Sequence, residues 1–176
     1  MSRVFFCCCV FVGMLGTLRA ANPLAGTWRL EPDRGTDLPA WQTLDLDIRV
    51  TGHVVTITRK FAAGRRTFED VTPVDLAKPF NVVPVAWWPD NRHIGAYIGG
   101  DKTERVRGEW IGGDHTLRLT TDLVLATQQG DHPVNILSNY TVSTNGRQLT
   151  LIEIRSTRSR PVVYVFQRIN GDEARA

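Results

Sequence analysis

Histidines are the side chains of this sequence with the widest chemistry at neutral pH, since imidazole can serve as acid, base or metal ligand. Each of the four lies in or beside a turn-forming stretch, and no two share a strand face at ligand spacing. A zinc site needs at least three protein ligands in the correct geometry. We therefore expect no metal site and interpret the four as exposed loop side chains: His53, His93, His115 and His132.

Nucleophilic catalysis has no better support. The sequence contains no Gly-x-Ser-x-Gly elbow, and no glycine-rich loop leads into a helix to hold a phosphate. Asp45 and Asp47 share a face, but it is the polar face of an alternating strand, where carboxylates are solvated. The sequence predicts a protein that is not an enzyme and that carries no cofactor.

A tryptophan pair beside polar residues is a candidate binding surface. The segment reads Trp87-Trp88-Pro89-Asp90-Asn91-Arg92. Adjacent residues of a strand point to opposite faces, so at most one ring packs in the core, and the other anchors a surface or lines an opening. We take Trp87, Trp88 and Arg92 as candidate ligand or partner contacts, because an exposed ring can stack on a ligand ring or sugar. Ordinary packing of a bent, proline-rich edge is the alternative.

The elements that must position these residues are strands. Leu44, Leu46, Ile48 and Val50 alternate with polar residues, and the run 115–125 has the same period of two, which is typical of a strand with one buried face. No segment keeps helical spacing over three turns. Strands are expected near 25–31, 43–50, 53–61, 66–73, 80–87, 94–99, 102–110, 115–127, 133–143, 147–156 and 161–169.

Short, glycine-containing turns separate these strands. Asn145-Gly146 is the strongest turn signal, and it predicts a two-residue type I′ turn with positive φ at both positions. Short connections make consecutive strands antiparallel neighbours. The prediction is a single all-β domain, an antiparallel up-and-down barrel of about eight to ten strands; a β-sandwich is the alternative.

Two carboxylates fall on the apolar faces of their strands. Glu104 shares a face with Val106 and Trp110, and Glu153 shares one with Leu149 and Leu151. A carboxylate inside a barrel needs an arginine, a water or a ligand, because its burial without a partner is costly. Glu104 and Trp110, with Tyr164 of the last strand, therefore complete the candidate ligand contacts.

The N-terminus predicts export. Residues 1–20 combine a basic start at Arg3, an apolar run from Val4 to Leu15, and a small residue at Ala20, which is the layout of a secretory signal peptide. Residues 21–176 would then form the mature domain, periplasmic or extracellular, with no membrane segment left. All three cysteines lie within the signal, so the mature chain has no disulfide.

The charge balance argues against a nucleic-acid partner. The chain has 21 Lys and Arg against 18 Asp and Glu. The expected signal removes two basic residues, which leaves 19 against 18 and a net charge of +1. Nucleic-acid binding requires clustered basic residues. The densest basic stretch, residues 155–160, is interpreted as a solvated turn.

Both ends of the mature chain resemble one family. Gly26-x-Trp28 opens the first strand, and the last strand, Val162-Val163-Tyr164-Val165-Phe166-Gln167-Arg168, ends in a basic residue. The chain thus resembles lipocalin-like (calycin) domains, in particular those of uncharacterised exported bacterial proteins. The resemblance implies that Gly26 and Trp28 form the opening motif and that Arg168 packs over the indole to close the barrel.

Two functions follow as expectations. The first is a non-catalytic exported barrel that binds a small apolar or amphipathic molecule in its interior. The alternative is a cell-envelope interaction protein with a filled barrel, which uses Trp87 or Trp88 and nearby loops to contact a protein or glycan.

Overall fold

Antiparallel strands make up most of the computed structural model, which describes residues 22–36, 43–85 and 97–170. Within these residues lie eleven strands and one 3-10 helix. In chain order they are β1 (Gly26–Leu30), η1 (Pro32–Arg34), β2 (Thr43–Thr51), β3 (Val54–Ala63), β4 (Arg66–Asp75), β5 (Asn81–Pro84), β6 (Tyr97–Ile98), β7 (Thr103–Ile111), β8 (Thr116–Thr127), β9 (Gly130–Val142), β10 (Gln148–Arg155) and β11 (Val162–Ile169). In this described part, no helix has the length and hydrophobicity to cross a bilayer.

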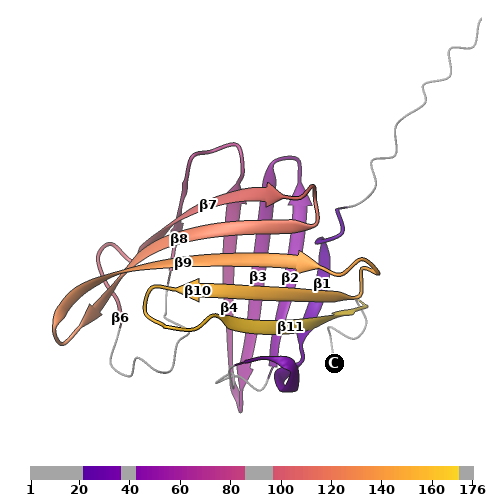
Figure 1. Cartoon of the computed structure of the whole chain (residues 1–176). Coiled ribbons are helices and arrows are strands. Elements are labelled where there is room, and N and C mark those ends of the chain that lie inside the picture. The colour runs from indigo at the N-terminus through magenta and orange to yellow at the C-terminus, as the bar shows by residue number, and fades with distance from the viewer. Residues whose placement is uncertain (1–21, 37–42, 86–96, 171–176) are drawn as a thin grey trace, which may run out of the picture.

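The sheet curls into a nearly closed barrel. Its strand order is β4-β3-β2-β1-β11-β10-β9-β8-β7-β5, and the short β6 pairs with β8 outside this path. Every pairing is antiparallel, and the first strand lies beside the last. Figure 1 shows β1–β4 running upright behind β7–β11, which cross in front of them. The all-β barrel prediction is confirmed, and the sandwich alternative is wrong.

Alternating burial separates the inside of the barrel from the outside. On β8, Leu117, Leu119, Leu123 and Leu125 are buried together with Thr121. The same alternation places Leu44, Leu46 and Ile48 of β2 inside. This period of two, read from the sequence, is therefore what sets the interior surface.

Side chains fill the seam between the two ends of the sheet. The Asp75 backbone N–H donates to Asn81 Oδ1 (3.0 Å), and Asn81 Nδ2 donates to the carbonyls of Asp75 (3.1 Å) and Val106 (3.3 Å). The amide thus replaces part of the missing ladder between β4 and β7. Gly108 leaves room for Leu76 there, because a Cβ on Gly108 would lie 2.5 Å from Leu76 Cδ2.

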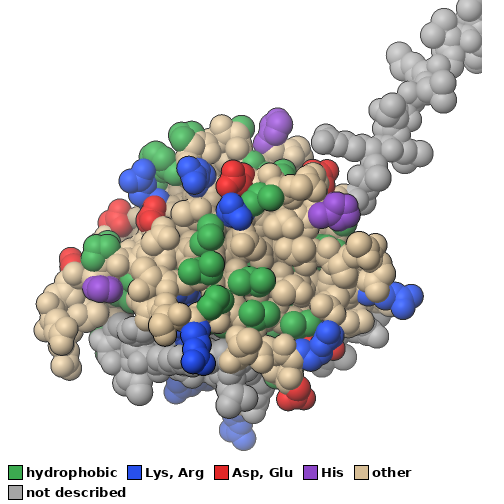
Figure 2. Space-filling view, in the orientation of Figure 1, with side chains coloured by type: hydrophobic (Ala, Val, Ile, Leu, Met, Phe, Trp, Pro, Cys, Tyr) green, Lys and Arg blue, Asp and Glu red, His purple; other side chains and the backbone are tan. Residues whose placement is uncertain are grey.

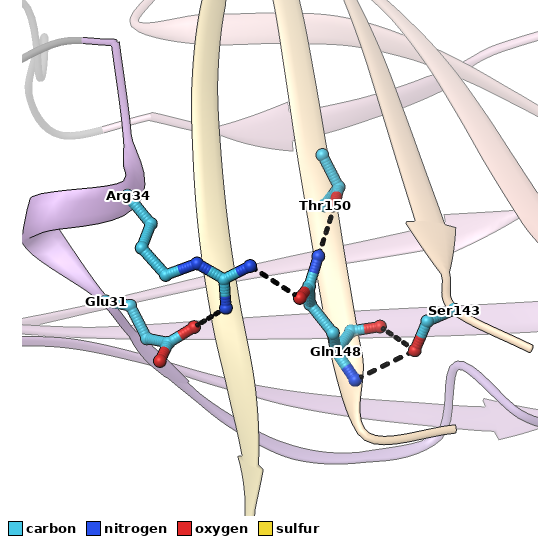
Figure 3. Close-up of polar contacts among 5 residues, drawn as sticks. All are labelled: Glu31, Arg34, Ser143, Gln148 and Thr150. Atoms are coloured by element: carbon cyan, nitrogen blue, oxygen red, sulfur yellow. Dashed lines mark hydrogen bonds and ion pairs between the residues drawn. The ribbon is translucent and has the colours of Figure 1, made fainter. Parts of the chain in front are cut away.

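The helix η1 acts as a strap over the outside of β11. The Glu31 N–H, just before η1, donates to the Val165 carbonyl (2.8 Å), and the outward-facing side chain of Val165 is buried. Arg34 pairs with Glu31 (2.6 Å) and donates to Gln148 Oε1 on β10 (2.9 Å), as Figure 3 shows. The segment after β1 is therefore fixed against the closing strands.

The hairpin between β9 and β10 is wider than the predicted type I′ turn. Gly146 has a positive φ of +69°, but among the described non-glycine residues Lys102 alone has a positive φ, so Asn145 does not. Instead the Gly146 N–H donates to the Ser143 carbonyl (2.8 Å), and Asn145 Oδ1 accepts from the Arg147 N–H (3.0 Å). The two-residue turn was wrong because side-chain hydrogen bonds stabilise a five-residue connection.

Candidate functional site

One end of the barrel is plugged by Trp28. Its side chain is fully buried, and the indole Nε1 donates to the Leu24 carbonyl at 3.0 Å. Arg168 lies opposite Trp28 in the β1–β11 register, with its guanidinium carbon 4.0 Å from the ring centre. We call this region, formed by Leu24, Gly26, Trp28 and Arg168, the sealed end.

Arg168 is held by backbone carbonyls as well as by the indole. Its Nε donates to Gly146 (2.7 Å), Nη1 to Ala25 (2.8 Å) and Nη2 to Pro23 (2.5 Å). Gly26 has φ +143°, and a Cβ there would lie 2.3 Å from Arg168 Nη1. The structure thus brings Gly26, Trp28 and Arg168 together. The Gly146 carbonyl is a further member that sequence reasoning did not identify.

The opposite end of the interior is charged. Five ionisable side chains share the apolar, inward faces of β3, β4, β7 and β10. Three of them lie near the strand ends away from Trp28, whereas the two on β3 and β4 lie in the middle of their strands, in the register row that runs from Trp28 through Leu46. We call this group the polar end; its members are Arg59, Asp70, Glu104, Glu153 and Arg155.

Arg59 and Asp70 form a cross-strand ion pair. They lie directly opposite each other on β3 and β4, with Arg59 Nη1 2.8 Å from Asp70 Oδ2. Arg59 Nη2 also donates to the hydroxyl of the buried Tyr140 on β9, at 3.4 Å. Burial works against the charge of Arg59, but Tyr140 and Asp70 outweigh it and raise the pKa of the guanidinium. Burial raises the pKa of Tyr140, so its hydroxyl stays neutral at physiological pH.

Glu153 and Arg155 pair on one strand. They are two residues apart on β10 and therefore point the same way, with Arg155 Nη2 2.5 Å from Glu153 Oε2. Arg155 is buried, with 5% of its surface exposed. The inward orientation expected for Glu153 is thus accompanied by an arginine partner.

Glu104 has no such partner. It is partly buried on β7, opposite Val83 of β5. No residue of the described ranges hydrogen-bonds or ion-pairs with its carboxylate. Burial raises its pKa above the ordinary value; Arg59 opposes this rise, and Asp70 and Glu153 add to it. Glu104 therefore interacts electrostatically with the two ion pairs without hydrogen-bonding to either.

The structure places two of the other candidate contacts in one register row, away from Glu104. Trp110 and Tyr164 are partly buried and pack against the core. Trp110 lies opposite Leu117, six residues beyond Glu104 on the same strand, or about 20 Å at the rise of a strand, so the structure does not bring it to Glu104. Tyr164 lies opposite Leu151 on β10. Trp87, Trp88 and Arg92 lie outside the described residues.

The histidines form no site within the described part of the chain. His53, His115 and His132 are exposed, and His93 lies outside the described residues. No group of three or more His, Cys, Asp or Glu among the described residues could hold a metal ion.

Sequence reasoning missed Arg59, Asp70 and Tyr140. It was also wrong about Arg155, which it placed in a solvated turn and which is buried at the end of β10. One signal was available for Arg59. It lies midway between Ile57 and Phe61 on the same face of β3, and both of these residues are buried. A charged residue at an apolar position of an alternating strand indicates an interior charge in the same way as Glu104 and Glu153 do.

A pocket opens at this same end of the strands. It measures about 330 Å³ and is bounded by the start of β2, the end of β3 and the start of β4. Phe61 and Phe68, which lie opposite each other, form part of its lining. On their strands Phe61 and Phe68 are the inward-facing residues that follow Arg59 and Asp70 toward the rim of the barrel. The rim is therefore aromatic beside this ion pair.

Apolar side chains also lie on the outside of the barrel. Figure 2 shows hydrophobic side chains gathered over the middle of the β7–β11 layer. On β10, Ile152 and Ile154 face outward and are 37% and 48% exposed.

Comparisons with known proteins identify the fold. No protein family model matches the chain, and no curated protein does. The crystal structure of secretory abundant heat soluble protein 4 from Ramazzottius varieornatus matches with a TM-score of 0.52 at 9% identity, over 85% of this chain and 97% of that chain. An abundant heat soluble (SAHS) protein of the same organism, from a dimer sample, matches with a TM-score of 0.51 at 8% identity and the same coverage. At such identities the likeness concerns the fold alone: this chain has the lipocalin-like β-barrel fold of those structures.

Proposed function

We propose that this protein is an exported, non-catalytic barrel that binds a small amphipathic molecule at the polar end of its interior. The observation that carries the proposal is Glu104, a partly buried carboxylate that no described residue hydrogen-bonds. A fold that needed only stability would place an apolar residue there, because an unpaired buried carboxylate is costly.

The chemistry of the interior supports an amphipathic ligand. Aliphatic side chains line much of the interior, among them the fully buried Ile57 and Val106. Small-molecule sites combine such apolar walls with a few converging polar groups that orient the ligand. The polar end supplies these groups beside the aromatic rim of Phe61 and Phe68.

Native mass spectrometry of the mature protein tests this function directly. Protein isolated without denaturation should carry an excess mass that is lost on unfolding, and the delipidated protein should bind eight-carbon probes such as octanol. In two-dimensional NMR spectra the shifted amides should lie on β3, β4 and β7 near the polar end. Absence of both the excess mass and any probe binding would reject the proposal.

The alternative function is a filled barrel that contacts a protein or glycan through Trp87 or Trp88 and nearby loops, and the outer face of the sheet offers a second surface for such contact. The exposed Ile152 and Ile154 provide apolar area on the outer face, and contiguous exposed apolar area is typical of interaction sites. Under this alternative, replacing both isoleucines with serine abolishes partner binding and leaves the interior unchanged.

A further inference from the structure

We propose that the head group bound at the polar end is a cation, specifically an ammonium that pairs with Glu104. This inference rests on the proposed function and specifies its ligand class. It follows from the charges at that end, from a second unsatisfied polar group, and from the level of both groups in the barrel.

The charges at the polar end leave a carboxylate in excess. Among the described residues, three carboxylates face two guanidiniums, and each guanidinium already has a carboxylate: Arg59 has Asp70 at 2.8 Å, and Arg155 has Glu153 at 2.5 Å. An anionic head group would have to displace one of these carboxylates, whereas a cation would pair with the remaining one, Glu104. Salt screens interior ion pairs less than surface pairs. The negative charge of Glu104 therefore decides that the polar end prefers a cationic head group over an anionic one.

Thr72 is an independent sign of a missing partner. It faces inward on β4, two residues beyond Asp70, and is 2% exposed. Its Oγ1 is buried and has no hydrogen-bond partner. Buried hydroxyls are nearly always satisfied in folded proteins, so this oxygen lacks the partner that a donor in the interior would supply.

The register of the strands places Thr72 and Glu104 at a similar level. Asn81 bonds to Asp75 across the seam, and two residues further along β5 Val83 lies opposite Glu104. On β4, two residues back from Asp75 is Pro73, which is the neighbour of Thr72 in the sequence. At this level β5 lies between β4 and β7, so a group on the inner face of β5 has Thr72 on one side and Glu104 on the other.

An ammonium group satisfies these acceptors better than other head groups. It carries three N–H donors and no acceptor, so one donor can reach the Glu104 carboxylate and another Thr72 Oγ1. A hydroxyl supplies one donor and no charge. A carboxylate supplies no donor and would add a fourth negative charge to the polar end.

Three probes with the same tail and different head groups test the inference: octylamine, octanol and octanoate. Titration calorimetry of the delipidated mature protein at neutral pH should give octylamine an affinity about tenfold higher than that of octanol, as expected for a charge-assisted hydrogen bond. Octanoate should bind more weakly than octanol.

Glu104→Gln should remove the preference for the amine and leave octanol binding unchanged, because glutamine keeps the shape and loses the charge. Glu109→Gln is the matched control, since Glu109 lies on the same strand but faces outward and is exposed. It should leave all three affinities unchanged. Thr72→Val should weaken octylamine binding a few-fold and affect octanoate less.

The outcomes separate the inference from the function on which it rests. If octanol binds but octylamine binds no more tightly, or octanoate binds most tightly, the ammonium is wrong and the amphiphile function stands. The same holds if Glu104→Gln keeps the amine preference. If none of the three probes binds, both proposals fall. The probe series on the unmodified protein decides the matter even where a variant folds poorly.

Discussion

The two ends of the barrel use buried polar groups in opposite ways. At the sealed end, Arg168 donates to three backbone carbonyls and stacks on Trp28, whose own N–H is also bonded. At the polar end, two ion pairs surround Glu104, which none of the described residues hydrogen-bonds. The first arrangement is complete without a ligand, whereas the second is where we propose that a ligand binds. Satisfied polar groups thus belong to the architecture of this barrel, and the Glu104 carboxylate belongs to the proposed site.

The comparison predicts the largest loss of stability at the sealed end. Trp28→Ala should lower the free energy of unfolding by about 4 kcal/mol, because it removes the largest fully buried side chain and leaves a cavity. Phe68→Ala at the rim of the polar end should cost less than about 1 kcal/mol, since that ring is 43% exposed. Urea denaturation measures both. Equal losses would mean that the two ends contribute alike to stability.

A second prediction compares two arginine–aspartate pairs of equal length. Asp70→Ala leaves the inward-facing Arg59 without its carboxylate and should cost about 2 kcal/mol. Asp45→Ala removes the partner of Arg29 on the outside of the barrel, also at 2.8 Å, and should cost less than about 1 kcal/mol. High salt should reduce the second effect more than the first. A larger cost for Asp45 would show that the interior pair is fully hydrated.

A third prediction concerns the close approach of Gly26 and Arg168. Gly26→Ala should cost about 1–2 kcal/mol, because alanine disfavours φ +143° and its Cβ would meet Nη1 of Arg168. In an Arg168→Ala background the same substitution should cost less, since only the backbone strain remains. A double-mutant cycle measures the difference. Strictly additive costs would show that the clash is absorbed elsewhere.

The period of two in the sequence predicted the barrel and both of its inward glutamates. It predicts which face a residue occupies but not its height in the barrel. For that reason it grouped Glu104 with Trp110, which lies six residues away toward the sealed end. Height follows from strand pairing, and pairing depends on the register of every neighbouring strand.

The Arg59–Asp70 pair was hidden for a related reason. On β3 the charged neighbours Arg59 and Lys60 are adjacent, so only the flanking Ile57 and Phe61 indicate which of the two points inward. Asp70 lies on a strand whose first half is largely exposed on both faces, so its pattern carries little information. The pair is defined only when β3 and β4 are aligned.

The smallest expected effect on stability has the opposite sign and belongs to Glu104. Burial raises its pKa in the folded protein, so between the ordinary and the raised value the folded state binds more protons than the unfolded state. The stability that the protonated carboxyl contributes is complete below the ordinary pKa and is lost as pH rises through the raised value. Glutamine stays neutral at every pH, so Glu104→Gln removes this loss of stability. The variant should therefore match the parent protein in acid and unfold at a higher temperature near neutral pH.

Thermal unfolding of Glu104→Gln and Glu109→Gln from mild acid to neutral pH checks this pH dependence. Glu109→Gln should follow the parent protein throughout, because that carboxylate is exposed. A variant that becomes more stable at neutral pH while losing the amine preference indicates a residue retained for binding at the expense of stability. A structural role predicts the reverse, since replacing a carboxylate that stabilises the barrel would lower the unfolding temperature.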